Sequence, residues 1–196
     1  MKYGCRKCRR EGEKLLLKGD RCLSPKCAIT KRPYPPGQHG LQIKKKLSEY
    51  GRQLREKQRL KKIYGLSEST LKKYYINSEK SKGNTTERLI SLLELRLDNV
   101  LYRSNLTNSR SGSRQIVSHG KVLVNDHKVT IPSIILKEKD KISFTKDLNY
   151  AKISSQNLAW FKADSKKGDI IIDHIPGRDE VDINVNENLV VEFYSR

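Results

Sequence analysis

Four cysteines are the residues of this chain most clearly suited to chemistry. They are Cys5, Cys8, Cys22 and Cys27, spaced C-x2-C-x13-C-x4-C, and no other cysteine occurs among the 196 residues. A C-x2-C pair forms a tight turn that aims two thiolates at one ion, and the second pair completes a tetrahedral set. The spacing predicts a structural metal site with no open position for a catalytic water. Zinc is the expected ion, an iron–sulfur cluster suits four thiolates equally, and free or paired thiols are the alternative.

Positive charge surrounds these cysteines. Residues 1–75 contain 22 Lys and Arg against 6 Asp and Glu, whereas the remainder contains 19 against 16. A metal-binding segment next to a concentrated cationic surface favours a polyanionic partner, and RNA is the polyanion we expect.

Several functions are disfavoured by the same sequence. No apolar run approaches the ~18–20 residues of a membrane helix, and the first residues lack the apolar core of a signal peptide. The histidines form no recognisable triad with a nucleophile and a carboxylate, and Gly-rich phosphate loops are absent. We therefore expect neither an enzyme nor a small-molecule substrate, and no membrane partner.

The elements that must position the cysteines and cations divide into four segments. Residues 1–46 read as a four-cysteine metal knot followed by a Pro-rich, basic extended arm that ends in Lys44, Lys45 and Lys46. Residues 47–84 read as a basic helical domain that packs with the C-terminal segment, residues 147–196. Residues 85–146 read as a small α+β domain inserted between them. The fold class expected is α+β.

The helical domain begins with the most one-sided charge pattern. Ser48 is the expected N-cap and Gly65 the expected end of the first helix. Only Glu49 and Glu56 oppose the cations that this helix is expected to expose, which are Arg52, Arg55, Lys57, Arg59, Lys61 and Lys62. One-sided charge repels itself along a helix, and an anionic partner relieves that repulsion.

A second helix of this domain is expected to start at Ser67. The tyrosines at helical spacing could stack on bases, but at such spacing a place in the core is favoured over stacking; they are Tyr64, Tyr74 and Tyr75.

The inserted domain is expected to start with helices and end with strands. Thr85 or Thr86 is the expected cap of its first helix, and a further helix is expected over residues 109–119. Strands are expected at 121–124, 129–131, 134–136 and 141–145, with a turn at Asn125-Asp126. The last segment is expected to begin with a helix from Asp147 to about Trp160 and to end in strands at 170–172 and 189–193.

Motifs along the whole chain resemble the small-subunit ribosomal protein S-four family in its bacterial, four-cysteine form. The cysteine segment with Arg32-Pro33-Tyr34-Pro35-Pro36-Gly37-Gln38-His39-Gly40 is similar to that family's N-terminal knot and hinge. Leu93-Glu94-Leu95-Arg96-Leu97-Asp98-Asn99-Val100 is similar to the opening of its S-four-type RNA-binding domain. Val191-Glu192-Phe193-Tyr194-Ser195-Arg196 is similar to its C-terminus.

The resemblance implies a structural constituent of the small ribosomal subunit, in a cytoplasmic or an organellar ribosome. Such a protein binds ribosomal RNA at a helical junction of the 5′ domain, nucleates assembly of the subunit body, and lies beside the channel that mRNA enters, next to ribosomal proteins S-three and S-five. A free assembly factor or translational regulator is the alternative. The residues implied to bind RNA are Lys44, Lys45, Lys46, Arg52, Arg55, Arg59, Lys61, Lys62, Arg110, Arg114, His119 and Lys121.

Overall fold

The computed structural model describes residues 4–42, 46–80, 83–145, 158–164 and 168–196. The chain forms two compact units, one of residues 1–79 with 184–196 and one of residues 80–183. Helices and an antiparallel sheet make the protein an α+β fold, which confirms the expected class. Within the described ranges no helix combines the length and the apolar character needed to cross a membrane.

The first unit is helical. Its elements are α1 (Gly4–Glu11), α2 (Asp20–Leu23), α3 (Ala28–Lys31), α4 (Glu49–Tyr64), α5 (Glu68–Glu79) and α9 (Glu187–Tyr194). As predicted, the Ser48 hydroxyl caps α4 by accepting the Gly51 N–H at 3.2 Å. Gly65 ends the helix in the left-handed conformation, with φ of 61°. Ser67 likewise accepts the N–H of Thr70 at the start of α5.

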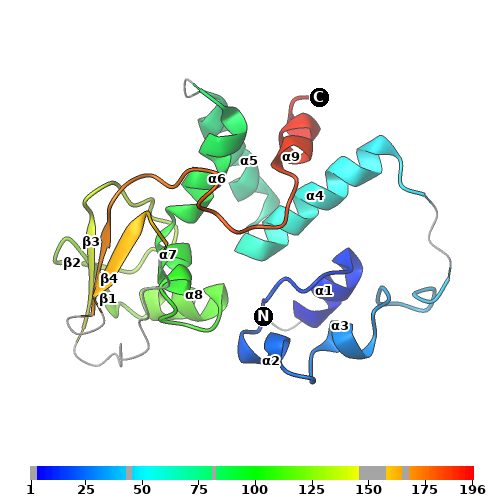
Figure 1. The fold of residues 1–196 in the computed structure, drawn as a ribbon, viewed down its shortest axis with the longest axis horizontal. Coiled ribbons are helices and arrows are strands. Elements are labelled where there is room, and N and C mark those ends of the chain that lie inside the picture. The colour runs from blue at the N-terminus through cyan, green and yellow to red at the C-terminus, as the bar shows by residue number, and fades with distance from the viewer. Residues whose placement is uncertain (1–3, 43–45, 81–82, 146–157, 165–167) are drawn as a thin grey trace. The chain divides into compact units, whose positions relative to one another are not determined.

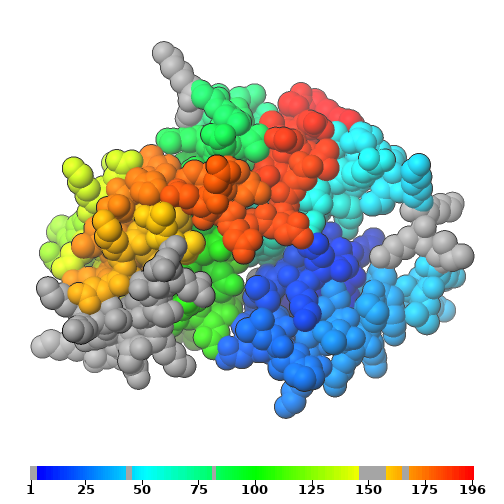
Figure 2. Space-filling view, in the orientation of Figure 1, coloured from blue at the N-terminus to red at the C-terminus, as the bar shows by residue number. Residues whose placement is uncertain are grey.

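The chain returns at its end to pack on α4, so that α9 lies beside the longest helix of the unit (Figure 1). In Figure 2 the red surface of the last residues adjoins the cyan surface of α4. The prediction of a strand at 189–193 is wrong. The Asn186 side chain caps a helix here, and Val190 is fully buried on its inner face, so packing overrides the β propensity of the Leu-Val-Val run.

The core of the first unit contains the tyrosines considered above as base-stacking candidates. Tyr64, Tyr74 and Tyr75 are buried together with Leu60 and Leu71, which confirms their place in the core. A small cluster of Cys8, Leu15 and Leu17 packs against Ile63 of α4. The N-terminal segment therefore buries some apolar surface of its own, more than its composition suggested.

The second unit places three helices beside a five-stranded antiparallel sheet. The helices are α6 (Thr85–Glu94), α7 (Leu97–Arg103) and α8 (Arg110–Ser118), and the strands are β1 (Val122–Val124), β2 (His127–Val129), β3 (Lys141–Phe144), β4 (Phe161–Asp164) and β5 (Asp169–Ile172). The strand order is β2-β1-β3-β5-β4. Strands β4 and β5, which lie in the segment expected to accompany the helical domain, complete this sheet. The four-segment division itself stays a prediction.

Details of the second unit differ from expectation. Asn84, not Thr85 or Thr86, caps α6, because its amide oxygen accepts the Thr86 N–H at 3.0 Å. Residues 134–136 do not form the expected strand; Ile135 makes an isolated antiparallel β-bridge with Arg96. The expected helix from Asp147 falls largely on 146–157, which lie outside the described residues, and Phe161 already belongs to β4.

The predicted turn between β1 and β2 is confirmed. Asn125 and Asp126 both have positive φ, 49° and 65°. Two consecutive left-handed residues give the twist that a two-residue hairpin needs, and Asn and Asp tolerate this conformation better than most residues.

Candidate nucleic-acid interface

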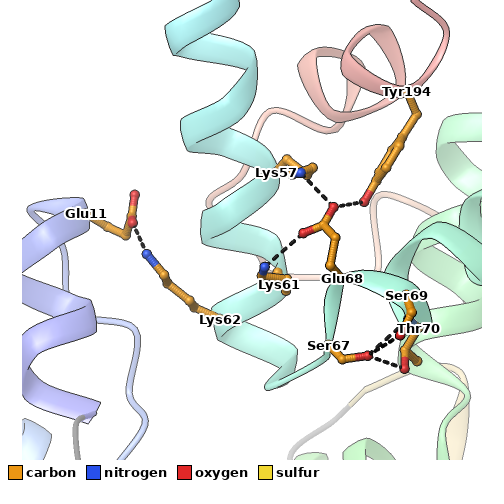
Figure 3. Close-up of polar contacts among 9 residues, drawn as sticks. All are labelled: Glu11, Lys57, Lys61, Lys62, Ser67, Glu68, Ser69, Thr70 and Tyr194. Carbon is orange, nitrogen blue, oxygen red and sulfur yellow. Dashed lines mark hydrogen bonds and ion pairs between the residues drawn. The ribbon is translucent and has the colours of Figure 1, made fainter.

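Helix α4 is the centre of an ion-pair network within the first unit. Glu68 accepts hydrogen bonds from Lys57 at 2.6 Å, from Lys61 at 2.8 Å and from the Tyr194 hydroxyl at 2.9 Å (Figure 3). The Lys57 ammonium also lies 4.1 Å from the ring centre of Phe193. The carboxylate thus joins α4, α5 and α9 at one point.

The protonation of this cluster follows from its contacts. Partial burial opposes ionisation of Glu68, but the hydrogen bonds from Lys57, Lys61 and Tyr194 prevail and lower its pKa to about 2. Burial and the adjacent Glu68 charge raise the pKa of Tyr194, so the phenol keeps the proton that it donates.

Three more cations of α4 pair with acidic residues at the end of α1 and just after it. The Glu11 carboxylate contacts Arg55 Nη1 at 3.3 Å and also contacts Lys62. Arg59 contacts Glu13 and, at 3.2 Å, Glu56 of its own helix. Burial, with repulsion from Glu11 and Glu187, raises the pKa of Glu56 despite the hydrogen bond from the Asn186 N–H. The expectation that Glu49 and Glu56 alone oppose these cations is therefore corrected.

The cations that α4 was expected to expose differ in accessibility. Lys57, which was not among the predicted RNA-binding residues, is buried, and the predicted residues Arg55, Arg59, Lys61 and Lys62 are half-buried. Arg52 is exposed and lies 3.6 Å from Glu49. Lys46 is also exposed, whereas Lys44 and Lys45 lie outside the described residues.

The predicted arginines of the second unit have internal partners. Arg114 Nε donates to Oδ2 of the buried Asp98 at 2.6 Å, and Arg96 donates to the same oxygen at 2.9 Å. Arg110 Nε donates to Asn99 at 2.7 Å. These bonds fix α8 against α7, so the two arginines hold the helices together through their Nε atoms.

The Arg110 guanidinium lies 4.3 Å from the ring centre of Tyr102, a cation–π distance. At the other end of α8, His119 is exposed and Lys121 half-buried. The Lys128 side chain lies against Gly120, whose φ is +67°, and a Cβ there would collide with it. Lys128 was not among the predicted RNA-binding residues. Its side chain lies at Gly120, between His119 and Lys121 in the sequence, and adds a further basic side chain to these two.

A basic groove occurs in the first unit that the predicted residue set missed. It has a volume of about 440 Å³ and is lined by one alanine and five cations, which are Arg9, Arg21, Lys26, Lys31 and Arg32. Arg9 is held in place by a hydrogen bond of 2.9 Å from its Nε to the Tyr34 carbonyl. The available signal was the excess of Lys and Arg among the cysteines, but α2 and α3 had to form before those residues could share one groove.

The four cysteines line one small pocket, together with Leu17 and Ile29 among others. All are free thiols, and Cys8, Cys22 and Cys27 are buried. Burial raises the pKa of Cys8, as does repulsion from the other three sulfurs, while the Leu15 N–H opposes the rise. Burial alone would raise the pKa of Cys27. Hydrogen bonds to its sulfur from the N–H groups of Ile29 and Thr30 and from the Thr30 hydroxyl outweigh burial, so the pKa of Cys27 is lowered. Among the described residues, no group of three or more His, Cys, Asp or Glu side chains is arranged so that it could hold a metal ion.

Comparison with known proteins connects these features. The family model described as ribosomal protein S4/S9 N-terminal domain matches residues 2–94, and the S4 domain matches residues 95–142. Small ribosomal subunit protein uS4A of Alkaliphilus metalliredigens is 47% identical over 200 residues, covering 98% of this chain and 96% of that protein. The chain belongs to the ribosomal protein S4 family. Small ribosomal subunit proteins uS4 of Halothermothrix orenii and Clostridioides difficile are 48% and 46% identical over 208 and 200 residues, with 98% of this chain and 96% of each protein covered.

Membership in the S4 family confirms the resemblance seen in the sequence and the expectation of a structural, non-enzymatic protein. The matched S4 domain includes α7, α8 and the strands β1 and β2. Arg110, Arg114, His119 and Lys121 all lie in it, and it is an RNA-binding domain. The four-cysteine metal form stays a prediction.

Proposed function

We propose that this protein is a structural constituent of the small ribosomal subunit that binds ribosomal RNA directly. The observation that carries the proposal is identity of 46–48% over 98% of the chain to proteins named small ribosomal subunit protein uS4. The basic groove, the exposed Arg52 of α4 and the half-buried Lys121 after α8 support it, because such surfaces neutralise the phosphates of RNA helices that converge and repel one another. The shape of the folded RNA sets most of the specificity.

The finer role proposed is that of a primary binder at a helical junction of the 5′ domain, which nucleates assembly of the subunit body. The same proposal places the protein beside the channel that mRNA enters, with ribosomal proteins S-three and S-five as neighbours. Lys44, Lys45 and Lys46 then face the message, since they follow the Pro-rich hinge and form a run of three lysines.

A filter-binding titration tests direct binding. The purified full-length chain is expected to prefer 5′-domain ribosomal RNA over bulk competitor RNA, with an affinity that falls steeply as salt rises. Equal affinity for both RNAs at low salt overturns the proposal.

A sucrose gradient separates this role from that of a free assembly factor or regulator. A resident subunit protein stays with mature small subunits after a moderate salt wash. Recovery only from precursor fractions or from the free pool identifies the alternative.

The cysteine pocket is proposed to hold one structural zinc ion, with an iron–sulfur cluster as the alternative. The chemistry of the lining supports the proposal, because Cys5, Cys8, Cys22 and Cys27 line one pocket and four thiolates saturate a tetrahedral ion. Bound there, zinc would link α1 to the α2–α3 segment through metal–sulfur bonds and would supply no catalytic chemistry. Metal analysis with a visible absorption spectrum distinguishes the two, since an iron–sulfur cluster is coloured and zinc is not.

A further inference from the structure

Two acidic side chains of the N-terminal segment are directed away from its basic groove. Glu11 and Glu13 contact α4, where they meet Arg55, Arg59 and Lys62. Five cations of the same segment instead line the basic groove described above, and none of the described residues that line it is acidic. The segment therefore presents a cationic groove while its carboxylates neutralise a neighbouring helix.

Burial and additional partners hold Glu11 and Glu13 in their contacts with α4. The Glu11 side chain is 3% exposed and is shared between Arg55 and Lys62, whose side chains are 32% and 15% exposed. Glu13 is held on its other side by the Asn184 amide, 3.1 Å away, next to the start of α9. Two carboxylates thus occupy the positions that phosphate oxygens would take on three cations of α4.

Ion pairing changes what these cations contribute to RNA binding. A free surface Lys or Arg that meets a phosphate displaces a condensed counterion, which drives sequence-independent binding. A cation already held by an internal carboxylate displaces none until that pair is broken, and opening a largely desolvated pair leaves a buried charge without its partner. Arg55, Arg59 and Lys62 are therefore poor ligands for an arbitrary polyanion.

We propose that Glu11 and Glu13 are specificity-determining residues, which suppress non-specific RNA binding by keeping Arg55, Arg59 and Lys62 in internal ion pairs. This inference rests on the proposed RNA-binding function. Folded 5′-domain RNA is recognised through its shape and through the groove and S4-domain cations, which these carboxylates do not touch. Neutralising Glu11 and Glu13 accordingly lowers the preference for the correct RNA without improving its binding.

The test uses the full-length chain with Glu11→Gln/Glu13→Gln, and with Glu13→Gln alone. Glutamine keeps the size of the side chain and removes its charge. The matched control is Glu138→Gln/Asp179→Asn, which makes the same change in net charge at two exposed residues with no ion pair in the described part of the chain. Affinities for poly(A) and for 5′-domain ribosomal RNA are measured across a range of salt concentrations.

The double variant is expected to bind poly(A) about 10-fold more tightly than the control at low salt. Its salt slope on poly(A) is expected to steepen by about 1.5–2, since the released Arg55 and Lys62 each add about 0.7 on a single strand and Arg59, which keeps Glu56 as a partner, adds less. Affinity for the 5′-domain RNA is expected to change less than about 2-fold. A poly(A) affinity and slope equal to those of the control overturn the inference, whereas a wild-type chain without preference for 5′-domain RNA overturns the proposed function instead.

The substitution of the buried Glu11 could itself unfold the N-terminal segment. A double-mutant cycle of Glu13→Gln and Arg59→Gln, which leaves Glu11 in place, keeps the test decisive in that case. Glu13 is 38% exposed, so Glu13→Gln preserves the fold, which limited proteolysis verifies. Arg59→Gln is expected to change poly(A) binding little in the wild-type chain but to abolish the gain produced by Glu13→Gln. Additive effects of the two substitutions overturn the inference.

Discussion

Lys57, in the middle of α4, donates a 2.6 Å hydrogen bond to Glu68 in the first turn of α5. The lysine side chain is only 6% exposed, while the carboxylate is 45% exposed. The charge of Lys57 is therefore buried and depends on a partner that solvent can still reach. This asymmetry makes the stability of the first unit sensitive to the ionisation of Glu68.

Glu68 is expected to contribute an acid-sensitive part of that stability. Its pKa of about 2 lies below the ordinary value of 4.5, so its contribution is fully present above pH 4.5 and is lost as the pH falls toward 2. Glu68→Gln is expected to destabilise the protein by about 1–2 kcal/mol at neutral pH, less than the ~3–5 kcal/mol of a fully buried pair because solvent screens the carboxylate. Urea unfolding from pH 7 to pH 2 measures both effects.

The matched control for Glu68 is Glu49→Gln, which removes an exposed carboxylate that lies 3.6 Å from Arg52 of the same helix. Its effect is expected to stay below about 0.5 kcal/mol. The difference between Glu68→Gln and the wild type is expected to shrink between pH 4.5 and pH 2; a constant difference contradicts the assignment.

Tyr194 is expected to act through both its hydroxyl and its ring. Tyr194→Phe removes the 2.9 Å hydrogen bond to Glu68 but keeps the stacking on Tyr75, whose ring centre is 5.0 Å away. A loss of about 1 kcal/mol is expected from the hydrogen bond, against about 3 kcal/mol for Tyr194→Ala. Equal losses in the two variants, measured by chemical unfolding, would show that the ring contributes nothing.

The predicted metal site gives a localised expectation. Cys8→Ser is expected to release the metal and to loosen roughly the first 30–40 residues. Without the metal, the described part of this segment is held by one small apolar cluster, in which Cys8, Leu15 and Leu17 pack against Ile63. The second unit, whose core is separate, is expected to keep its protease resistance. Metal content and limited proteolysis check this, and an unchanged N-terminal cleavage pattern argues against a structural metal.

The basic groove is expected to bind phosphates without reading sequence. Arg21→Gln/Lys26→Gln is expected to weaken binding of all RNAs tested by a similar factor and to reduce the salt slope by about 1 for each phosphate that is no longer neutralised. Lys72→Gln/Lys73→Gln is the matched control, since both lysines are exposed on α5 and outside the groove. Identical salt slopes in the two double variants would remove the groove from the interface.

The lysines that follow the Pro-rich hinge are expected to contact mRNA and not the helical junction of the 5′ domain. Changing Lys44, Lys45 and Lys46 to Ala is expected to leave affinity for 5′-domain RNA nearly intact and to slow the unwinding of structured mRNA by assembled ribosomes. The measurement pairs a filter-binding assay with translation through a hairpin of graded stability. A large loss of 5′-domain binding would reassign the arm to the junction.

Local signals in the sequence predicted local structure well. Ser48, Gly65 and the Asn125-Asp126 turn act on backbone groups within a few residues of themselves, so their role is evident from neighbouring residues alone. The same local reasoning failed at 189–193, where a β-branched run forms α9. That outcome depends on α4, more than 120 residues earlier in the chain, against which the helix packs.

The charge network shows the same limit for the candidate site. Glu11 and Arg55 are 44 residues apart in sequence, and Lys57 and Glu68 lie on different helices. The count of cations on α4 was correct, but which of them remain available to RNA depends on how α1, α5 and α9 fold back on that helix. The sequence indicated a polyanionic partner, but the internal ion pairs of Arg55, Arg59 and Lys62 became evident only from the fold.

The return of residues 184–196 to α4 has a consequence during synthesis on the ribosome. A chain made from its N-terminus holds every residue of the second unit once Ile183 has left the exit tunnel, while the first unit still lacks α9. Until residues 187–194 are translated, Lys57 has neither the Phe193 ring nor the Tyr194 hydroxyl of its cluster around it. The first unit thus completes its packing only after the second unit has been made, and a stop codon before residue 187 leaves it without α9.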